Sequence, residues 1–145
     1  MNTIEIFYED IPSIKIPKQH IRKYSKWLIN NELKEQGDIT LILCSDKYLL
    51  DINVNYLKHN YYTDIITFNY VVKNTISGDL FISIDRVKEN SQKFNTLWIE
   101  ELYRVIFHGL LHLIGYNDKT EEEKTIMREK EDYYLSEVDF SKIKI

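Results

Sequence analysis

The pattern of apolar and polar positions divides the chain into strands and helices. Apolar residues that alternate with polar ones, or run together between turn signals, predict strands over residues 3–8, 38–44, 65–72 and 76–84. Apolar residues that recur every three or four positions predict helices over 18–36, 46–57, 85–95 and 97–114, and a last helix that begins after Thr120. This order favours an α+β fold, in which one mixed sheet of about four strands is covered mainly by helices.

Polar residues and a glycine mark where several of these elements begin and end. Ser45 and Asp85 are suited to cap the N-termini of two helices, and Thr120 with Glu123 forms a capping box for the last one. Gly37 is placed to end the first helix. The last two strands are expected to pair as an antiparallel hairpin.

Length and composition bound the class of protein. At 145 residues the chain is expected to form a single domain over 1–145. Its formal net charge of −4 provides no overall attraction to nucleic acid, so an RNA-binding surface would have to be a local patch. Cys44 is the only cysteine, which excludes an intramolecular disulfide.

The start of the chain and its hydropathy argue against secretion and membrane insertion. Glu5, Glu9 and Asp10 stand where a secretory signal would carry basic residues followed by an apolar run. No stretch approaches the roughly 20 apolar residues that a membrane span requires. We therefore expect a cytoplasmic protein with no membrane partner.

The predicted helix over 97–114 is apolar around nearly its whole circumference, as in a buried helix, and carries the candidate chemistry. His108 and His112 are four residues apart and therefore lie on one face. Gly115 can end the helix and turn the chain, which brings Asp118 toward the same point. Two imidazole nitrogens and one carboxylate could hold one catalytic zinc ion per chain and leave a fourth position for water.

Two other interpretations of these residues remain open. The histidines could be hydrogen-bonded core residues without a metal. The spacing also matches that of the metzincin proteases, a zincin-like arrangement, but Gly109 replaces the glutamate base and Asp118 replaces the third histidine. The missing glutamate argues against a peptidase.

Longer segments resemble a known family. The segment from His108 to Tyr116, His-Gly-Leu-Leu-His-Leu-Ile-Gly-Tyr, resembles the signature HGxLHLxGYDH of the YbeY family of bacterial metal-dependent endoribonucleases, and it departs from the signature at Asn117 and Asp118. Upstream, residues 63–68 (Thr-Asp-Ile-Ile-Thr-Phe) are similar to the family's T-D-V-L-S-F segment, and residues 78–80 (Gly-Asp-Leu) to its G-D-I strand.

The resemblance implies a function. It implies a zinc-dependent endoribonuclease that cuts single-stranded RNA, acts in maturation of the 3′ end of small-subunit ribosomal RNA and in ribosome quality control, and meets the small ribosomal subunit. The alternatives are a non-catalytic ribosome assembly factor with a structural zinc, or another zinc hydrolase.

The resemblance also draws attention to residues outside the metal helix. In the family, a Y-R-G-K-D-like loop supplies an arginine to the active site; here Tyr56 matches, but Leu57 stands in place of the arginine. Lys58 and His59 follow and could bind substrate through positive charge or proton transfer, or could belong to a solvated loop. Asp79 resembles a family position beside the cleft and could accept a hydrogen bond from a ligand imidazole.

Other charged residues are expected to have structural roles. Glu100 and Glu101 fall in the first turn of the histidine-bearing helix, where they suit the helix dipole. In the last helix Ile126, Met127 and Tyr134 are expected to face inward, and the charged residues between them are expected on its solvated face.

Overall fold

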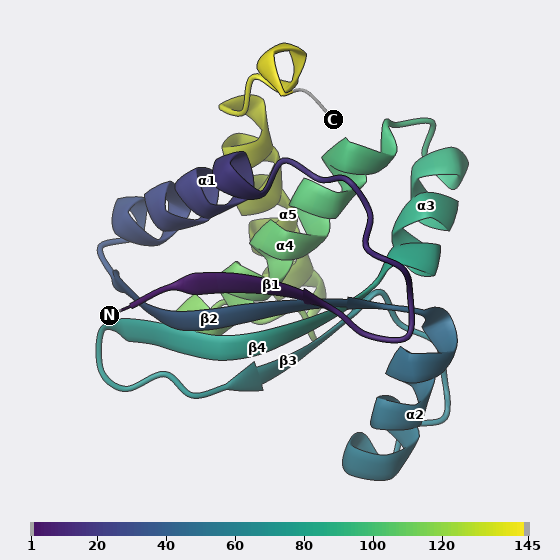
Figure 1. Ribbon diagram of the computed structural model, residues 1–145. Coiled ribbons are helices and arrows are strands. Elements are labelled where there is room, and N and C mark those ends of the chain that lie inside the picture. The colour runs from purple at the N-terminus through teal and green to yellow at the C-terminus, as the bar shows by residue number, and fades with distance from the viewer. Residues whose placement is uncertain (1, 144–145) are drawn as a thin grey trace.

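The computed structural model describes residues 2–143, which form one four-stranded sheet and five α-helices (Figure 1). The predicted α+β fold with a mixed sheet is confirmed. In chain order the elements are β1 (Ile4–Tyr8), α1 (Lys18–Asn31), β2 (Glu35–Cys44), α2 (Asp46–Leu57), β3 (Ile65–Asn69), β4 (Thr75–Ser83), α3 (Ile84–Lys93), α4 (Trp98–Ile114), α5 (Glu121–Ser136) and a short 3-10 turn (Phe140–Lys142).

The strands lie in the order β1-β2-β4-β3. The first two pairs are parallel and the third, β4 with β3, is the predicted antiparallel hairpin. One row of partners crosses the whole sheet, from Ile4 through Ile39 and Gly78 to Asn69. The parallel pairs require crossover connections, which α1 and α2 with the β3 hairpin provide.

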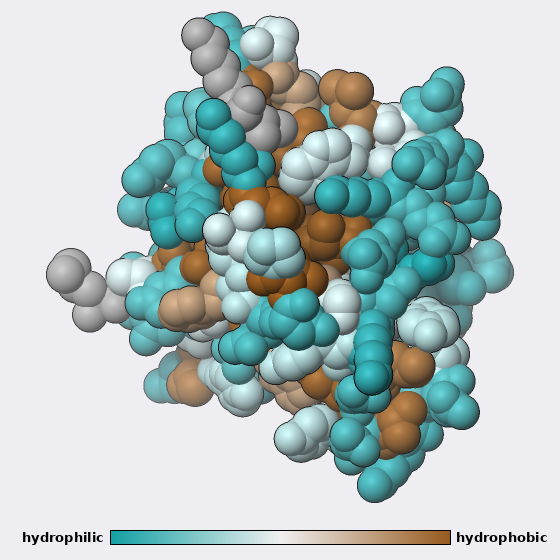
Figure 2. Space-filling model, turned by 45° about the vertical axis from the view of Figure 1, so that its right-hand side comes forward, coloured by the Kyte–Doolittle hydropathy of each residue, from teal (hydrophilic) through white to brown (hydrophobic). Residues whose placement is uncertain are grey.

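Helices cover the two faces of the sheet unequally. In Figure 1, α1, α3, α4 and α5 lie above the sheet, and α2 lies below its right-hand end. The larger core fills the space under the first group, whereas α2 covers a smaller cluster of Cys44, Leu49, Ile52 and Ile66. On the face drawn in Figure 2, apolar side chains appear as patches between hydrophilic ones.

Helix α4 lies very close to the sheet. A Cβ added at Gly109 would be 2.6 Å from Ile65 Cδ1 and 3.1 Å from the Leu80 side chain. Gly78 lies similarly close to the Leu113 side chain, whose methyl groups would be 3.0 Å from its added Cβ. The absence of side chains at the two glycines therefore fixes how deeply α4 sits over β3 and β4, and with it the position of the histidines.

Several predicted boundaries are confirmed and others are wrong. Ser45 caps α2 by accepting a hydrogen bond from the backbone N–H of Tyr48, and Thr120 with Glu123 forms the capping box of α5. The N-cap of α3 is Ser83 rather than Asp85, because the Ser83 hydroxyl accepts the backbone N–H of Arg86 at 3.2 Å.

The largest error concerns the first helix. It ends at Asn31, and Gly37 lies inside β2, where the pairing with β4 shifts register between Gln36 and Ile39. Leu33, which extended the helical periodicity, adopts a left-handed conformation and is 86% exposed. Pairing of Glu35 and Gln36 with β4 overrides the local helical pattern.

Cys44 is buried with a free thiol. Among the helices of residues 2–143, none combines the length and the apolar character needed to cross a membrane.

Candidate metal centre

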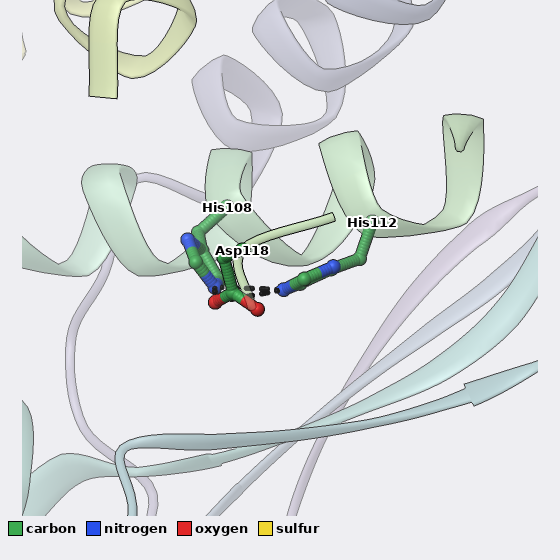
Figure 3. A group of neighbouring side chains, drawn as sticks. All are labelled: His108, His112 and Asp118. Atoms are coloured by element: carbon green, nitrogen blue, oxygen red, sulfur yellow. Dashed lines mark hydrogen bonds and ion pairs between the residues drawn. The ribbon is translucent and has the colours of Figure 1, made fainter. Parts of the chain in front are cut away.

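The structure brings His108, His112 and Asp118 to one point (Figure 3). The two imidazole Nε2 atoms are 2.9 Å apart. One carboxylate oxygen, Asp118 Oδ2, lies 3.3 Å from each of them. Each residue thus directs one donor atom into a shared space, and together they could hold a metal ion.

The loop after α4 places Asp118 because both of its ends are fixed. Gly115 has a φ of 126°, and its N–H donates to the carbonyl of Leu111 at 3.1 Å, which ends the helix. At the other end, the Glu123 carboxylate accepts the backbone N–H of Thr120 at 2.9 Å. The carboxylate of Asp118 is consequently held beside the helix that the chain has just left.

Both imidazoles are oriented by a partner on the nitrogen that faces away from the triad. His108 Nδ1 lies 2.7 Å from a Glu131 carboxylate oxygen, and His112 Nδ1 lies 2.9 Å from the main-chain carbonyl of Tyr116. A carboxylate and a carbonyl can only accept, so each Nδ1 carries a hydrogen and donates it. The neutral imidazoles then present unprotonated Nε2 atoms to the shared space, as metal-binding histidines do.

Glu131 is a part of the site that the sequence interpretation missed, because it was expected on the solvated face of α5. Its side chain is 7% exposed and accepts a hydrogen bond of 2.9 Å from Arg104, which also pairs with Asp132 at 2.7 Å. A signal was present: Glu131 follows Met127 by four residues and precedes Tyr134 by three, so it lies on the inward stripe.

Glu131 also sets the electrostatics of His108. Burial lowers the pKa of His108, but the hydrogen bond and negative charge of Glu131 outweigh burial and raise it, with Asp64 and Asp118 acting in the same direction. The carboxylate that makes His108 a better proton acceptor also makes it a stronger metal donor.

The triad opens into a cavity of about 580 Å³. Besides the triad, its charged lining residues are Asp64, Glu101, Arg104, Lys124, Arg128 and Glu131. Phe94 contributes an aromatic ring that is 55% exposed. Four carboxylates and three basic side chains thus line the cavity, and Arg104 is paired with Glu131 and Asp132, so the basic side chains there that pair with neither of these two acids are Lys124 and Arg128.

Two further acids line this cavity: Glu101, expected to suit the helix dipole, and Asp64, which resembles a family position beside the cleft and could equally form a turn. Glu101 lies in the first turn of α4 as expected, yet its side chain is buried at the cavity wall. Burial raises its pKa, against the opposing charge of Arg104. Burial likewise raises the pKa of Asp64, which precedes β3, against the opposing charge of His108. Perturbed carboxyl groups in a cavity are candidates for proton transfer.

The other predicted residues lie elsewhere. Lys58 ends α2 in a left-handed conformation and His59 stacks on Tyr61, and neither lines the cavity. The prediction that Asp79 supports a ligand imidazole is wrong, because Glu131 and Tyr116 occupy both Nδ1 positions. Alternation along β4 explains why: Gly78 and Leu80 face α4, so Asp79 points to the opposite face of the sheet.

Position 109 cannot supply a protease-like base. Gly109 faces Ile65 and Leu80 of the sheet, and an added Cβ would already be too close to Ile65. A glutamate there would collide with the sheet rather than reach the metal cluster. The geometry thus agrees with the sequence argument against a peptidase.

Comparisons with known proteins point in one direction. A profile of the family described as endoribonuclease YbeY matches residues 7–139. The chain is 47% identical over 133 residues to the endoribonuclease YbeY of Parabacteroides distasonis, across 92% of this chain and 94% of that protein. It is 49% identical over 135 residues to the endoribonuclease YbeY of Cytophaga hutchinsonii, again across 92% and 94%. The solution structure of TM1509 from Thermotoga maritima is similar, with a TM-score of 0.67 at 25% identity, across 92% of this chain and 87% of that one.

Proposed function

Because the chain belongs to the endoribonuclease YbeY family and hydrolyses RNA, we propose that it is a zinc-dependent endoribonuclease specific for single strands. The observation that supports this most strongly is the arrangement of the triad. Two imidazoles with their Nδ1 hydrogens engaged and one carboxylate converge inside a cavity that carries basic side chains.

The donor geometry fits zinc. Two ligands that are each about 2.0–2.1 Å from a zinc ion at a tetrahedral angle lie about 3.3–3.4 Å apart. Both separations between Asp118 Oδ2 and the histidine Nε2 atoms are 3.3 Å, and the separation between the Nε2 atoms, 2.9 Å, is slightly shorter. Nitrogen and carboxylate donors are also the set found in catalytic zinc sites.

The number of donors favours a catalytic over a structural ion. Structural zinc sites are closed by four protein ligands, whereas catalytic sites have three and an open position. Within residues 2–143 the cluster has three members, and Asp118 is 40% exposed on the cavity side. This supports the enzyme over a non-catalytic assembly factor with a structural zinc.

The chain's own residues can bind and orient the phosphodiester. Lys124 and Arg128, on the first two turns of α5, bring positive charge to the cavity that holds the triad. A zinc ion held there would supply an activated water and positive charge beside the scissile phosphate. Asp64 and Glu101, whose pKa values are raised by burial, are the candidates to accept or return a proton.

The preference for single strands is supported by Phe94. Its exposed ring lines the same cavity as the triad, and aromatic rings stack on bases only when those bases are unpaired. Lys58 and His59 are proposed as further RNA contacts, because their loop leads directly into Thr63 and Asp64 at the cavity wall.

We also propose the biological substrate from the family relationship. The RNA would be ribosomal, cut at the 3′ end of the small-subunit RNA, with a further role in ribosome quality control. The protein would then meet the small ribosomal subunit and act in the cytoplasm.

The proposed function is tested by comparing the wild type with His112→Ala and with His20→Ala. His20 lies at the start of α1 and does not line the cavity, so it controls for the loss of a histidine as such. Purified wild type and His20→Ala should contain about one zinc ion per chain and cut a single-stranded RNA faster than its duplex, because three donors hold the ion. His112→Ala should lose both zinc and cleavage. Full zinc content in His112→Ala would contradict the site, and equal cleavage of strand and duplex would contradict the specificity.

A further inference from the structure

A buried carboxylate outside the cavity accepts hydrogen bonds from three side chains. Glu32 caps the C-terminus of α1, and its side chain is 8% exposed. It accepts hydrogen bonds from the Tyr116 hydroxyl at 2.6 Å, from Lys130 Nζ at 3.1 Å and from the Tyr134 hydroxyl. A buried ion pair does not by itself indicate that a protein is more stable. The role of this cluster is therefore better judged from the parts of the chain that it holds in place.

One of these donors belongs to the metal loop. Tyr116 donates its hydroxyl to Glu32, and its main-chain carbonyl accepts the Nδ1 hydrogen of His112 at 2.9 Å. The same residue is two positions before Asp118. A continuous chain of contacts therefore runs from the end of α1, through Tyr116, to His112, and the backbone leads from Tyr116 to Asp118 two residues later.

Among residues 2–143, the hydrogen bond from the Tyr116 hydroxyl to Glu32 joins the loop after α4 to the end of α1. The N–H groups of Gly115 and Tyr116 bond back to α4, and those of Lys119 and Thr120 bond to Glu123 in α5. These bonds fix the two ends of the loop relative to the helices that flank it. The bond from Tyr116 to Glu32 adds a third point, on a different helix, beside the carbonyl that orients His112.

We propose that Glu32 is a positioning residue for the metal centre. By holding the Tyr116 side chain, it fixes the carbonyl that directs His112 Nε2 and the approach of the chain to Asp118, so that these donors are preorganised for the ion. A ligand whose orienting partner is displaced binds metal more weakly. The inference rests on the proposed metal site but adds a residue from an element that contributes nothing to the cavity.

Two tyrosines offer a matched pair for the test. Tyr116→Phe and Tyr134→Phe each remove one hydroxyl that donates to the same carboxylate and keep the ring, but only Tyr116 is tied to the metal loop. We would measure zinc affinity by competition with a chromophoric chelator, and the unfolding midpoint of the metal-free proteins. Both variants should lower the midpoint, whereas Tyr116→Phe should weaken zinc binding by about 10-fold, at the lower end of the range for partners that orient a ligand. Tyr134→Phe should leave zinc affinity within about twofold of the wild type.

The same measurement on Glu32 variants separates positioning from general stability. Glu32→Ala should weaken zinc binding about as much as Tyr116→Phe, and the two changes together should weaken it no further, because they break one chain of contacts. Glu32→Gln keeps an acceptor for the tyrosine and should recover part of the affinity. Cobalt(II) bound in place of zinc should show an altered visible spectrum in Glu32→Ala but not in Tyr134→Phe.

The outcomes distinguish this inference from the proposed function. If the wild type binds no zinc, both fail. If the wild type binds zinc and Tyr116→Phe binds it as tightly as Tyr134→Phe, the positioning role of Glu32 alone is overturned. Additive losses in the double variant would also overturn it, since Glu32 and Tyr116 would then act separately.

Discussion

The two histidines of the triad are supported by different kinds of partner. His108 is held by a buried charged side chain, Glu131 from α5, which is itself fixed by Arg104. His112 is held by a neutral main-chain carbonyl, that of Tyr116, in a loop. A side-chain partner can be removed by one substitution, whereas a carbonyl can only be displaced by moving the chain that carries it.

The difference extends to charge. The negative charge of Glu131 raises the pKa of His108 against the effect of burial, and a carbonyl dipole cannot supply a full charge to His112. Of the cavity's basic residues, Lys124 and Arg128 lie on α5, the helix that also supplies Glu131 to His108. For the proposed zinc ion, we expect the charge of Glu131 to strengthen His108 as a donor, and the loop that carries Tyr116 to set the orientation of His112.

The largest loss of zinc affinity is expected from a change at Asp118, which lies next to both histidines. Its oxygen lies 3.3 Å from each Nε2, so Asp118→Ala removes a donor rather than a support. Zinc affinity should fall by more than the roughly 100-fold that loss of an orienting partner can produce. The metal-free unfolding midpoint should change little, because the side chain is partly exposed. Chelator competition and thermal unfolding measure the two quantities. If both Asp118→Ala and Asp118→Asn bind zinc as tightly as the wild type, Asp118 is not a ligand and serves only in the turn.

The next effect should come from Glu131→Gln. Glutamine keeps an oxygen that can accept from His108 but removes the charge, so zinc affinity should fall by about 10–100-fold. Arg104 also loses a buried ionic partner, and the free energy of unfolding should drop by about 1–3 kcal/mol. Urea unfolding and zinc competition measure both. Glu129→Gln, an exposed position on the same helix, is the control and should change neither.

If zinc affinity falls less in Glu131→Gln than in Tyr116→Phe, the relative importance of the partners of His108 and His112 would be the opposite of what we expect. It would mean that loop geometry matters more to the ion than the charge beside His108.

How well the sequence predicted the site depends on where each residue lies in the chain. The triad falls within one helix and the turn after it, so periodicity and a helix-ending glycine were sufficient to bring its members together. Glu131 contacts His108, and Glu32 contacts Tyr116, only because α5 and α1 pack against α4. Local patterns show that Glu131 faces inward, but they cannot show which residue it meets.

The end of the first helix and the position of Asp79 were also wrongly predicted, because contacts between distant parts of the chain decide both. The first helix was extended to Gly37 because Leu33 continued an apolar stripe, yet the strand pairing of Glu35 with β4 decides the end of that helix. Asp79 is predicted to support an imidazole, but the alternation of side chains along β4 places it on the far face of the sheet. In both cases, contacts distant in sequence decide the outcome.

Salt dependence tests whether RNA approaches from the α5 side. Arg128→Ala should reduce the slope of log affinity against log salt for a single-stranded RNA by about 0.7, because one phosphate contact is lost. Lys58→Ala should reduce it by less, since Lys58 lies outside the cavity. Lys142→Ala, near the end of the described chain and exposed, serves as the control. An unchanged slope in Arg128→Ala with a reduced slope in Lys58→Ala would place the RNA path along the loop over 58–64 instead.

The smallest effect concerns Glu32 and the pH dependence of the free energy of unfolding in acid. Burial by itself raises the pKa of Glu32, but the hydrogen bonds from Tyr116, Tyr134 and Lys130 outweigh burial and lower it below its usual value. Because the pKa is lower in the folded protein, the ionised carboxylate contributes stability that is fully present above the unfolded value of about 4.3. That contribution is lost as the pH falls through the folded pKa.

Glu32→Gln carries no charge to titrate, so its free energy of unfolding should decline less steeply than that of the wild type between about pH 5 and pH 3. The absolute stability of the variant at neutral pH should be lower, because glutamine replaces an ionised acceptor of charged and hydroxyl donors. The two stability curves should therefore converge as the solution is acidified. Urea unfolding of the metal-free proteins at several pH values measures this, and excluding metal keeps proton competition at the histidines out of the comparison. Parallel curves over that range would mean that Glu32 has the same pKa in the folded and unfolded chain, and that its hydrogen bonds do not favour the ionised carboxylate that the positioning role assumes.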